Sequence, residues 1–151
     1  MIATHPNPVC RAVPSFMLHV AVDDVGDGDT FEQLWTKRVG DDHFELCCIP
    51  FFVYDMALGD VVRAEAATGY VIQSVVQRSG NGVVRVAVKR PEDVNAVHLR
   101  LHDLLGRLEY LCEWFAPGYV AISLEPARSH EEFFTALAEL GESVEIERVL
   151  I

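Results

Sequence analysis

The chain has 151 residues, half of them apolar and 23% charged, and a formal net charge of −11 at pH 7. This length and apolar content predict one globular domain with a sizeable core, or two small halves packed together. The net charge disfavours direct binding to nucleic acid or to an anionic membrane and favours a basic protein as partner. We expect no membrane span and no signal peptide, and therefore a cytoplasmic protein.

The charge is distributed unevenly along the sequence. Residues 41–65 carry −5, whereas residues 66–90 carry +4. Such asymmetry most often reflects a solvated surface. We expect the basic segment to form a pair of strands that exposes Arg78, Arg85 and Lys89.

The four cysteines show no Cys-x-x-Cys spacing, which argues against a zinc site. They are Cys10, Cys47, Cys48 and Cys112. We expect free thiols, with adjacent Cys47 and Cys48 on opposite faces of a strand as buried structural residues. No metal and no cofactor is expected.

The amino-terminal residues predict a flexible arm followed by a strand. Residues 1–14 hold three prolines and little periodicity, so we expect a flexible arm, with residues 15–151 forming a single compact domain. Residues 15–22 alternate as in a strand. The acidic turn at 23–29 resembles part of a calcium loop, but Phe31 occupies the next ligand position and no glutamate closes a twelve-residue loop, so a hairpin loop is favoured.

A series of short strands is expected next, joined by turns rich in glycine and aspartate. Pro50 ends regular pairing, and residues 51–58 form an apolar connection. Asn81-Gly82 is typical of a primed turn and predicts a hairpin between neighbouring strands. The expected strands are 31–39, 43–49, 61–66, 70–77 and 83–89.

The pattern changes to helical spacing after Pro91. An apolar stripe predicts one helix from Pro91 to Phe115, ended by Pro117-Gly118. A strand at 119–124, a helix from Ser129 to about Leu140 and a strand at 144–151 follow. Residues 79–151 are thus expected to run strand-helix-strand-helix-strand, and residues 15–78 to be mostly strands. The predicted fold is α+β, with an N-terminal curled antiparallel sheet or partial barrel packed with a C-terminal ferredoxin-like α/β sandwich.

Four segments resemble the bacterial DUF4265 family of unknown function. They are aromatic-x-Leu-x-x-Ile-Pro-Phe-Phe at 44–52, Gly-Asp-Val-Val at 59–62, Val-Val-x-x-Ser-Gly at 75–80 and Val-Arg-Val at 84–86. The resemblance covers about residues 30–150. Val83 stands where the family usually has threonine. The resemblance implies a shared fold in a bacterial cytoplasm and brings no known activity.

No catalytic set emerges from the sequence. His98 and His102 are spaced i, i+4 on the predicted helix, with Asp103 adjacent, but no glutamate follows His98 as in zinc proteases, so surface histidines are favoured. The Ser79-Gly-Asn-Gly turn joins strands and lacks the lysine of a phosphate-binding loop. A mid-strand cysteine has neither a helix start nor an obvious base to activate it.

The sequence therefore favours a non-enzymatic, acidic protein-binding module. An immunity protein that neutralises a basic, nuclease-type toxin fits this profile, because opposite charges speed association and acids can block a basic site. The residues predicted to bind the partner are Asp41, Asp42, Glu45, Asp55 and Asp60, with Phe52 and Tyr54 as anchors.

Two alternatives remain open. One is a small-ligand sensor or an enzyme, with a pocket between the two halves lined by Phe51, Phe52, Tyr54 and His43. The other is a protein that associates with itself through sheet edges. The sequence does not predict an oligomeric state.

Overall fold

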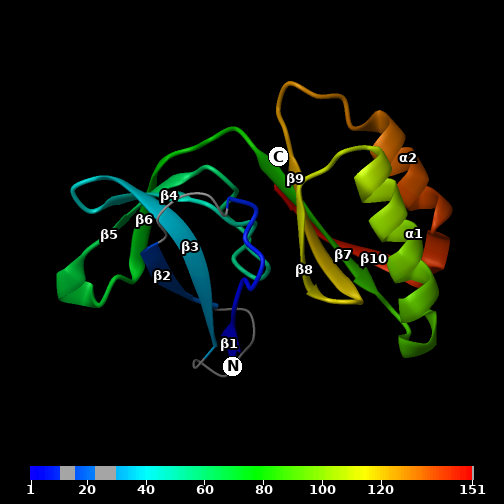
Figure 1. Cartoon of the computed structure of the whole chain (residues 1–151), viewed down its shortest axis with the longest axis horizontal. Coiled ribbons are helices and arrows are strands. Elements are labelled where there is room, and N and C mark those ends of the chain that lie inside the picture. Colours follow the sequence, from blue (N-terminus) through cyan, green and yellow to red (C-terminus); the bar gives the residue numbers. More distant parts are fainter. Residues whose placement is uncertain (11–15, 23–29, 151) are drawn as a thin grey trace.

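The fold comes from a computed structural model that describes residues 1–10, 16–22 and 30–150. It is a mixed α+β fold with two β-sheets and two α-helices, and the two sheets lie side by side along the long axis (Figure 1). The expected α+β class is confirmed. The acidic turn at 23–29, weighed as a calcium loop, lies outside the described residues.

The first sheet is built from the amino-terminal half. Its path runs β1-β3-β4-β5-β6, and β2 pairs with β3. β1 is parallel to β3, and the other pairs are antiparallel. A backbone hydrogen bond of 3.2 Å from His19 to the Tyr70 carbonyl links β2 to the segment leading into β6, although the described strands form no closed barrel. The strands are β1 Ile2–Ala3, β2 Phe16–Ala21, β3 Phe31–Gly40, β4 His43–Leu46, β5 Val61–Ala64 and β6 Ile72–Gln77.

The second sheet has four strands in the order β10-β7-β9-β8, and all its pairs are antiparallel. Both helices cover the face of this sheet that is turned away from the first half (Figure 1). Their apolar stripes, with Leu101, Leu105, Phe133 and Leu137, pack on the sheet to form one core. The elements are β7 Gly82–Val88, α1 Val94–Arg107, β8 Cys112–Ala116, β9 Tyr119–Leu124, α2 Glu131–Glu139 and β10 Val144–Leu150.

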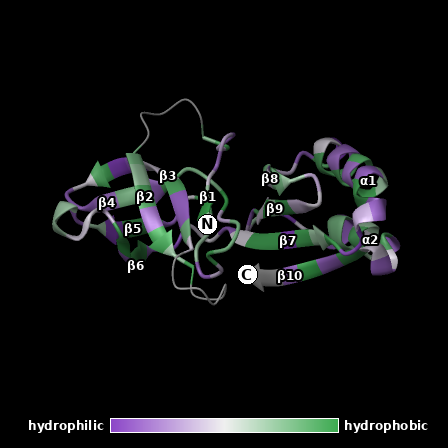
Figure 2. Cartoon of the chain, turned by 90° about the horizontal axis from the view of Figure 1, so that it is seen from below, coloured by the Kyte–Doolittle hydropathy of each residue, from purple (hydrophilic) through white to green (hydrophobic). Residues whose placement is uncertain are grey.

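Strand β7 is buried on both of its faces. Val84 and Val86 belong to the helix-covered core, whereas Val83 belongs to a cluster with Ile49 and Phe51 from the first half. Figure 2 shows β7 coloured as hydrophobic along most of its length, as expected of a strand covered on both sides. The second sheet is therefore the middle layer between the helices and the first half.

The predicted long helix was wrong. Helix α1 ends at Arg107, and the chain returns as strand β8. The helix ends in a Schellman motif, in which Tyr110 N–H donates to the Leu105 carbonyl at 2.9 Å and Glu109 takes a φ of 56°. Because glutamate rather than glycine occupies this left-handed position, the sequence carried no stop signal, and residues 79–151 run strand-helix-strand-strand-helix-strand.

The predicted hairpin at Asn81-Gly82 was also wrong. The strands on either side of this turn, β6 and β7, belong to different sheets. Ser79 Oγ and Asn81 Nδ2 instead donate to the Leu58 carbonyl at 2.8 and 2.9 Å. A Cβ added at Gly82 would lie 2.4 Å from the Leu150 carbonyl oxygen, so the glycine lets β10 approach closely.

The expected flexible arm is packed against the sheet over residues 1–10. Ala3 lies in β1 and is fully buried, and His5 is 2% exposed. The arm is held because β1 pairs with β3 and because His5 carries hydrogen bonds that no loose segment would keep. Residues 11–14 of the expected arm lie outside the described residues.

Candidate functional site

The segment between β4 and β5, residues 47–60, is the most unusual part of the structure. It contains no helix or strand, yet Ile49, Phe51 and Ala57 are almost completely buried. Buried backbone N–H and C=O groups need hydrogen-bond partners. In this β4–β5 segment many of the partners are charged side chains, and most of these come from distant parts of the chain.

Glu32 provides acceptors for three consecutive N–H groups. Its carboxylate is fully buried and accepts from Phe51 at 2.6 Å, Phe52 at 2.9 Å and Val53 at 3.0 Å. Its side chain lies on the inward face of β3, with buried Leu34 two residues further on. The acid therefore takes the place of a neighbouring strand for this part of the β4–β5 segment.

His5 lies between two buried carboxylates. Its Nε2 is 2.8 Å from Glu32 and its Nδ1 is 2.8 Å from Glu113, while Glu113 also accepts the Ile49 N–H at 2.6 Å. The imidazole stacks on Phe51 with 4.3 Å between the ring centres. Burial opposes the charged imidazolium, but the hydrogen bonds to Glu113 and Glu32 outweigh it and raise the pKa of His5 to about 9. At neutral pH this is a histidinium held by two acids.

Arg85 satisfies the carbonyls of the same segment. It is fully buried and donates to Pro50 O from Nε at 3.1 Å and from Nη2 at 2.8 Å, and to Val53 O at 2.9 Å. Its guanidinium lies 4.9 Å from the Tyr54 ring centre. Burial lowers the pKa of Arg85. The prediction that Arg85 faces solvent was wrong, because the carbonyls of an irregular buried segment needed a multiple donor. We call His5, Glu32, Arg85 and Glu113 the buried charge network.

Asp60 is buried too and does not reach the surface. It is 1% exposed and accepts the Ala57 N–H at 3.0 Å and the Ser79 N–H at 2.8 Å. Arg78 forms an ion pair with it at 3.2 Å. The prediction that Asp60 contacts a partner was therefore wrong, since its carboxylate organises the turn that ends the β4–β5 segment.

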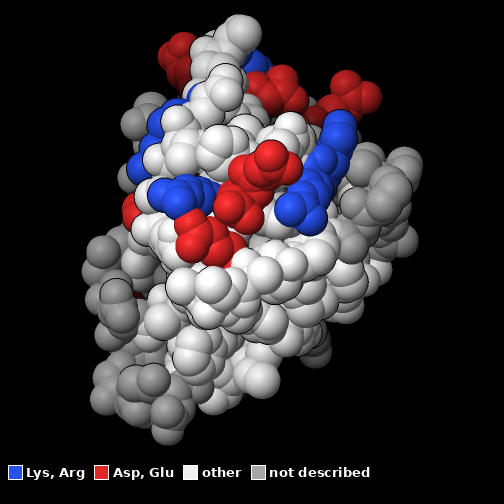
Figure 3. Space-filling view, turned by 90° about the vertical axis from the view of Figure 1, so that its left-hand side faces the viewer, with Lys and Arg blue, Asp and Glu red and all other residues white. Residues whose placement is uncertain are grey.

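The remaining predicted acids lie in two places. Asp41 and Asp42 form the turn between β3 and β4, and Glu45 lies on β4 directly opposite Lys37. Asp55 is exposed within the β4–β5 segment. Figure 3 shows acidic and basic side chains next to one another on the outer end of the first half. The predicted acids therefore do not share one uniformly acidic patch.

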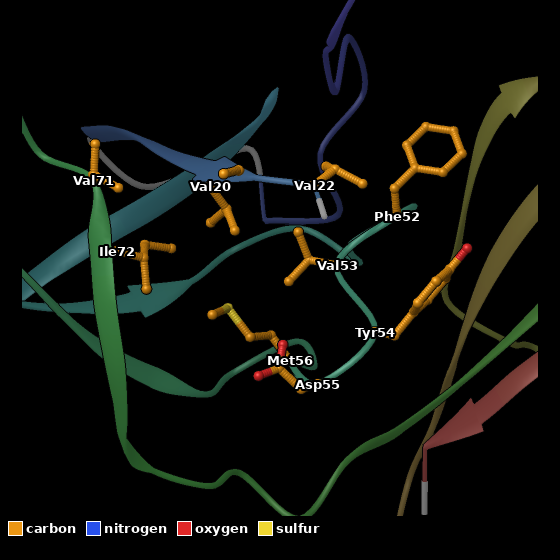
Figure 4. A pocket seen from close by; sticks show the side chains of 10 residues that line it. Val20, Val22, Phe52, Val53, Tyr54, Asp55, Met56, Val71 and Ile72 are labelled. Carbon is orange, nitrogen blue, oxygen red and sulfur yellow. The ribbon is translucent and has the colours of Figure 1, made fainter. Parts of the chain in front are cut away.

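A crevice of about 440 Å³ opens in the first half, rather than between the halves. Val20 and Val22 on one side and Val71 and Ile72 on the other form its walls (Figure 4). Phe52 and Tyr54 also border it, but Figure 4 shows their side chains turned away from these walls. The four residues predicted to line a pocket between the halves therefore do not line this crevice together. Phe51 is fully buried, and His43 lines a separate hollow.

The buried groups are arranged for structure rather than for nucleophilic chemistry. Burial raises the pKa of the Cys47 thiol to about 11 and that of Cys48 well above its ordinary value. The expectation that both are buried, free cysteines is confirmed. Within the described ranges no group of three His, Cys, Asp or Glu side chains is placed to hold a metal ion, and no helix is long and apolar enough to cross a membrane.

Sequence reasoning missed every member of the buried charge network. One signal was present: Glu32 shares a strand face with Leu34, and Arg85 shares one with Val83 and Ala87, so each charge is in phase with apolar residues. A charged residue on a strand that tertiary contacts bury on both faces needs a specific partner. His5 and Glu113 gave no such signal, because the elements that hold them were not predicted.

The comparisons with known proteins agree with the fold. No match is found among curated proteins. A solved structure, described as "Novel crystal structure of a hypothetical protein from Neisseria gonorrhoeae", is 18% identical and superposes with a TM-score of 0.66 over 89% of this chain and 94% of that one. At this identity the likeness concerns the fold alone. The model of the family described as Domain of unknown function (DUF4265) matches residues 32–147, and the chain belongs to this family.

Proposed function

We propose that the protein is a non-enzymatic, acidic protein-binding module, and specifically an immunity protein that neutralises a basic, nuclease-type toxin. The observation that carries this proposal is how the buried ionisable groups are used. The buried charge network and Asp60 are engaged in holding the β4–β5 segment, which leaves the large negative charge of the chain to act at its surface.

The acids available to such a partner are Asp41, Asp42, Glu45 and Asp55, which are exposed or half-buried. Glu45 lies opposite Lys37, so it contributes less net charge than the others. Half-buried Phe52 and Tyr54 border the crevice next to Asp55 and would supply apolar contact area. A net charge of −11 would steer a basic partner towards the protein at low ionic strength.

The test is affinity capture from the native host with the full chain as bait, followed by a salt titration of the recovered complex. We expect a basic protein whose affinity falls steeply with salt. The triple variant Asp41→Lys, Asp42→Lys, Asp55→Lys should weaken binding by roughly tenfold or more. Recovery of no basic partner, or an affinity that does not respond to salt, would overturn the proposal.

A matched control changes the net charge equally at another place. The triple variant Glu131→Lys, Glu139→Lys, Glu142→Lys alters exposed residues in and just after α2. Binding should change much less in this control than in the first variant. Equal loss in both would mean that only net charge matters and that these acids form no docking site.

The crevice favours a second candidate, a small-ligand sensor. Its volume of about 440 Å³ falls in the range of ligand pockets, and five of its ten lining residues are valine or isoleucine. Native mass spectrometry of the protein purified from its host would show a bound small molecule under this second proposal. An immunity protein should carry none.

The finer fold and the setting are proposals as well. We propose a bacterial cytoplasmic protein, in keeping with the four free cysteines. The β-α-β-β-α-β order and the strand order β10-β7-β9-β8 support a ferredoxin-like arrangement of the second half. The link between His19 and Tyr70 supports a partial barrel in the first. A crystal structure and cell fractionation would test these points.

A further inference from the structure

We propose that His98 and His102 on α1 form a two-histidine chelating site for a divalent transition-metal ion of the Cu²⁺, Ni²⁺ or Zn²⁺ class. The sequence showed only the i, i+4 spacing, which many surface histidine pairs share. The structure adds a hydrogen bond between His98 and the Pro117 carbonyl, which orients this imidazole, and a packing contact between His98 and Trp114. This site lies on α1, away from the β4–β5 segment, and does not depend on the proposed partner.

The two imidazoles lie on one side of the helix. Residues four apart are neighbours on an α-helix surface, and two histidines at this spacing bind zinc from one helix face in metalloproteases. The ring centres of His98 and His102 are 6.1 Å apart. His98 is half-buried and His102 is exposed, so the His102 ring has room to rotate towards an ion bound by His98.

A backbone carbonyl sets the tautomer of His98. Its Nδ1 lies 3.0 Å from the Pro117 carbonyl oxygen. A carbonyl only accepts hydrogen bonds, so Nδ1 carries the hydrogen and Nε2 of the neutral ring keeps a free lone pair. Metal-binding histidines almost always donate their other N–H in this way, which fixes the ring and raises its basicity.

Strand β8 supports the His98 ring as well. Trp114 on β8 packs edge-on against the His98 ring, with 4.4 Å between the ring centres. The ligand is therefore partly pre-oriented, which lowers the entropic cost of binding. Two protein ligands leave the other coordination positions to water, as in an open site.

Trp114 provides the readout for the experiment. The full chain, without a histidine tag, is titrated with Cu²⁺, Ni²⁺ and Zn²⁺ while tryptophan emission is recorded in the Trp35→Phe variant. We expect Cu²⁺ to quench Trp114 saturably at one ion per chain, with affinity in the order Cu²⁺ above Ni²⁺, and Zn²⁺ to compete for the same site. Isothermal titration calorimetry should give the same one-to-one stoichiometry.

Single variants decide whether these two residues hold the ion. His98→Ala and His102→Ala should each raise the apparent Kd for Cu²⁺ by about tenfold or more, because each removes one of two ligands. His43→Ala, at an exposed histidine on β4, should leave it unchanged. Circular dichroism checks that each variant is folded; His102 is exposed, so its variant should keep the wild-type fold. Quenching that does not saturate, or a Kd that neither variant changes, would overturn the proposal.

Discussion

We expect the stability of this protein to depend strongly on each member of the buried charge network. His5 is 2% exposed and bridges Glu32 and Glu113, and buried Arg85 interacts electrostatically with Glu32, so the buried charge network holds two positive and two negative charges. Removing one member of such a set leaves the others buried without a partner, which costs more than the pair contributes. We therefore expect the free energy of unfolding to depend on pH and to fall when a member of the network is substituted.

The pH effect follows from the raised pKa of His5. This pKa moves from 6.5 to about 9 on folding, so the folded chain holds the proton more tightly. The stabilisation is therefore complete below pH 6.5 and is lost as the pH rises through 9, and it amounts to roughly 3 kcal/mol. Urea unfolding between pH 6 and 9 should show the free energy of unfolding falling. His5→Gln should flatten this slope, and an unchanged slope would show that another group titrates.

The mutational effect is clearest at Arg85. Arg85→Lys keeps the charge but replaces the planar fork that binds Pro50 O twice and Val53 O once. We expect a loss of about 2–4 kcal/mol in the free energy of unfolding, measured by denaturant titration. Arg63→Lys, at an exposed position on β5, is the control and should change stability by less than about 0.5 kcal/mol. Similar losses in both variants would contradict this role for Arg85.

At the scale of elements, the β4–β5 segment is buried like a central strand, but it forms no hydrogen-bonded pairing with a neighbouring strand at residues 51–53. Its amides at Phe51, Phe52 and Val53 donate to one carboxylate instead of to a neighbouring strand. Such amides should exchange with deuterium as slowly as those in the sheets, because opening them exposes a buried charge. Irregular segments normally exchange fast, so this protection is a distinctive signature.

Hydrogen exchange followed by NMR tests this directly. In the wild type we expect slow exchange at Phe51, Phe52 and Val53. Glu32→Gln should speed exchange at these three amides by more than about tenfold, since one amide oxygen replaces two carboxylate oxygens. Exchange at Val86 in β7 should follow only the global loss of stability. Fast exchange of the three amides in the wild type would refute the role of Glu32.

The end of α1 offers a stabilising substitution. Glu109 has a φ of 56°, a conformation that costs an L-residue roughly 1 kcal/mol and glycine almost nothing. Glu109→Gly should therefore raise the free energy of unfolding by about 0.5–1 kcal/mol in thermal denaturation. Asp103→Gly, in the exposed middle of α1, should lower it by a similar amount. If both variants changed the free energy of unfolding in the same direction, the left-handed conformation of Glu109 at the end of α1 would be contradicted.

At the scale of the whole molecule, three apolar clusters are stacked in series. One fills the first half, one lies beneath the helices, and a third joins Ile49, Phe51 and Leu58 to Val83 and Ala121. Because the third cluster and the buried charge network both span the halves, we expect the chain to unfold as one unit.

Each half carries one tryptophan, which makes this testable. Trp35 lies on β3 and Trp114 on β8. In the Trp114→Phe and Trp35→Phe variants, the remaining emission should report the same midpoint as far-ultraviolet circular dichroism within each variant. Phe51→Ala should lower stability by about 3–5 kcal/mol as seen by both reporters. Separate transitions within one variant would show that the halves unfold independently.

Much of the architecture could be predicted from local sequence. The strand at Tyr119–Leu124 was placed with its observed bounds, and strands β3, β4 and β7 within a few residues, because alternation and turn residues act locally. Errors arose where the decisive contact is distant. The segment at Asn81-Gly82 has the residues of a hairpin turn, but β6 and β7 enter different sheets, and the Leu58 carbonyl accepts hydrogen bonds from the side chains of Ser79 and Asn81. Of the residues predicted to bind a partner, Asp41 and Asp55 are exposed, whereas Asp60 is buried.

The sequence by itself determined the α+β class, the acidic charge, the helical stripes and most strand positions, since these follow from composition and from periods of two and 3.6 residues. Only the tertiary structure decided which charges are buried. Glu32, Arg85, Glu113 and His5 come from the arm and from both sheets, and they meet because the β4–β5 segment has backbone groups that no strand satisfies. The free-energy cost of burying a charge depends on its partners, and no local sequence pattern identifies them. The buried charge network therefore could not be predicted from the sequence.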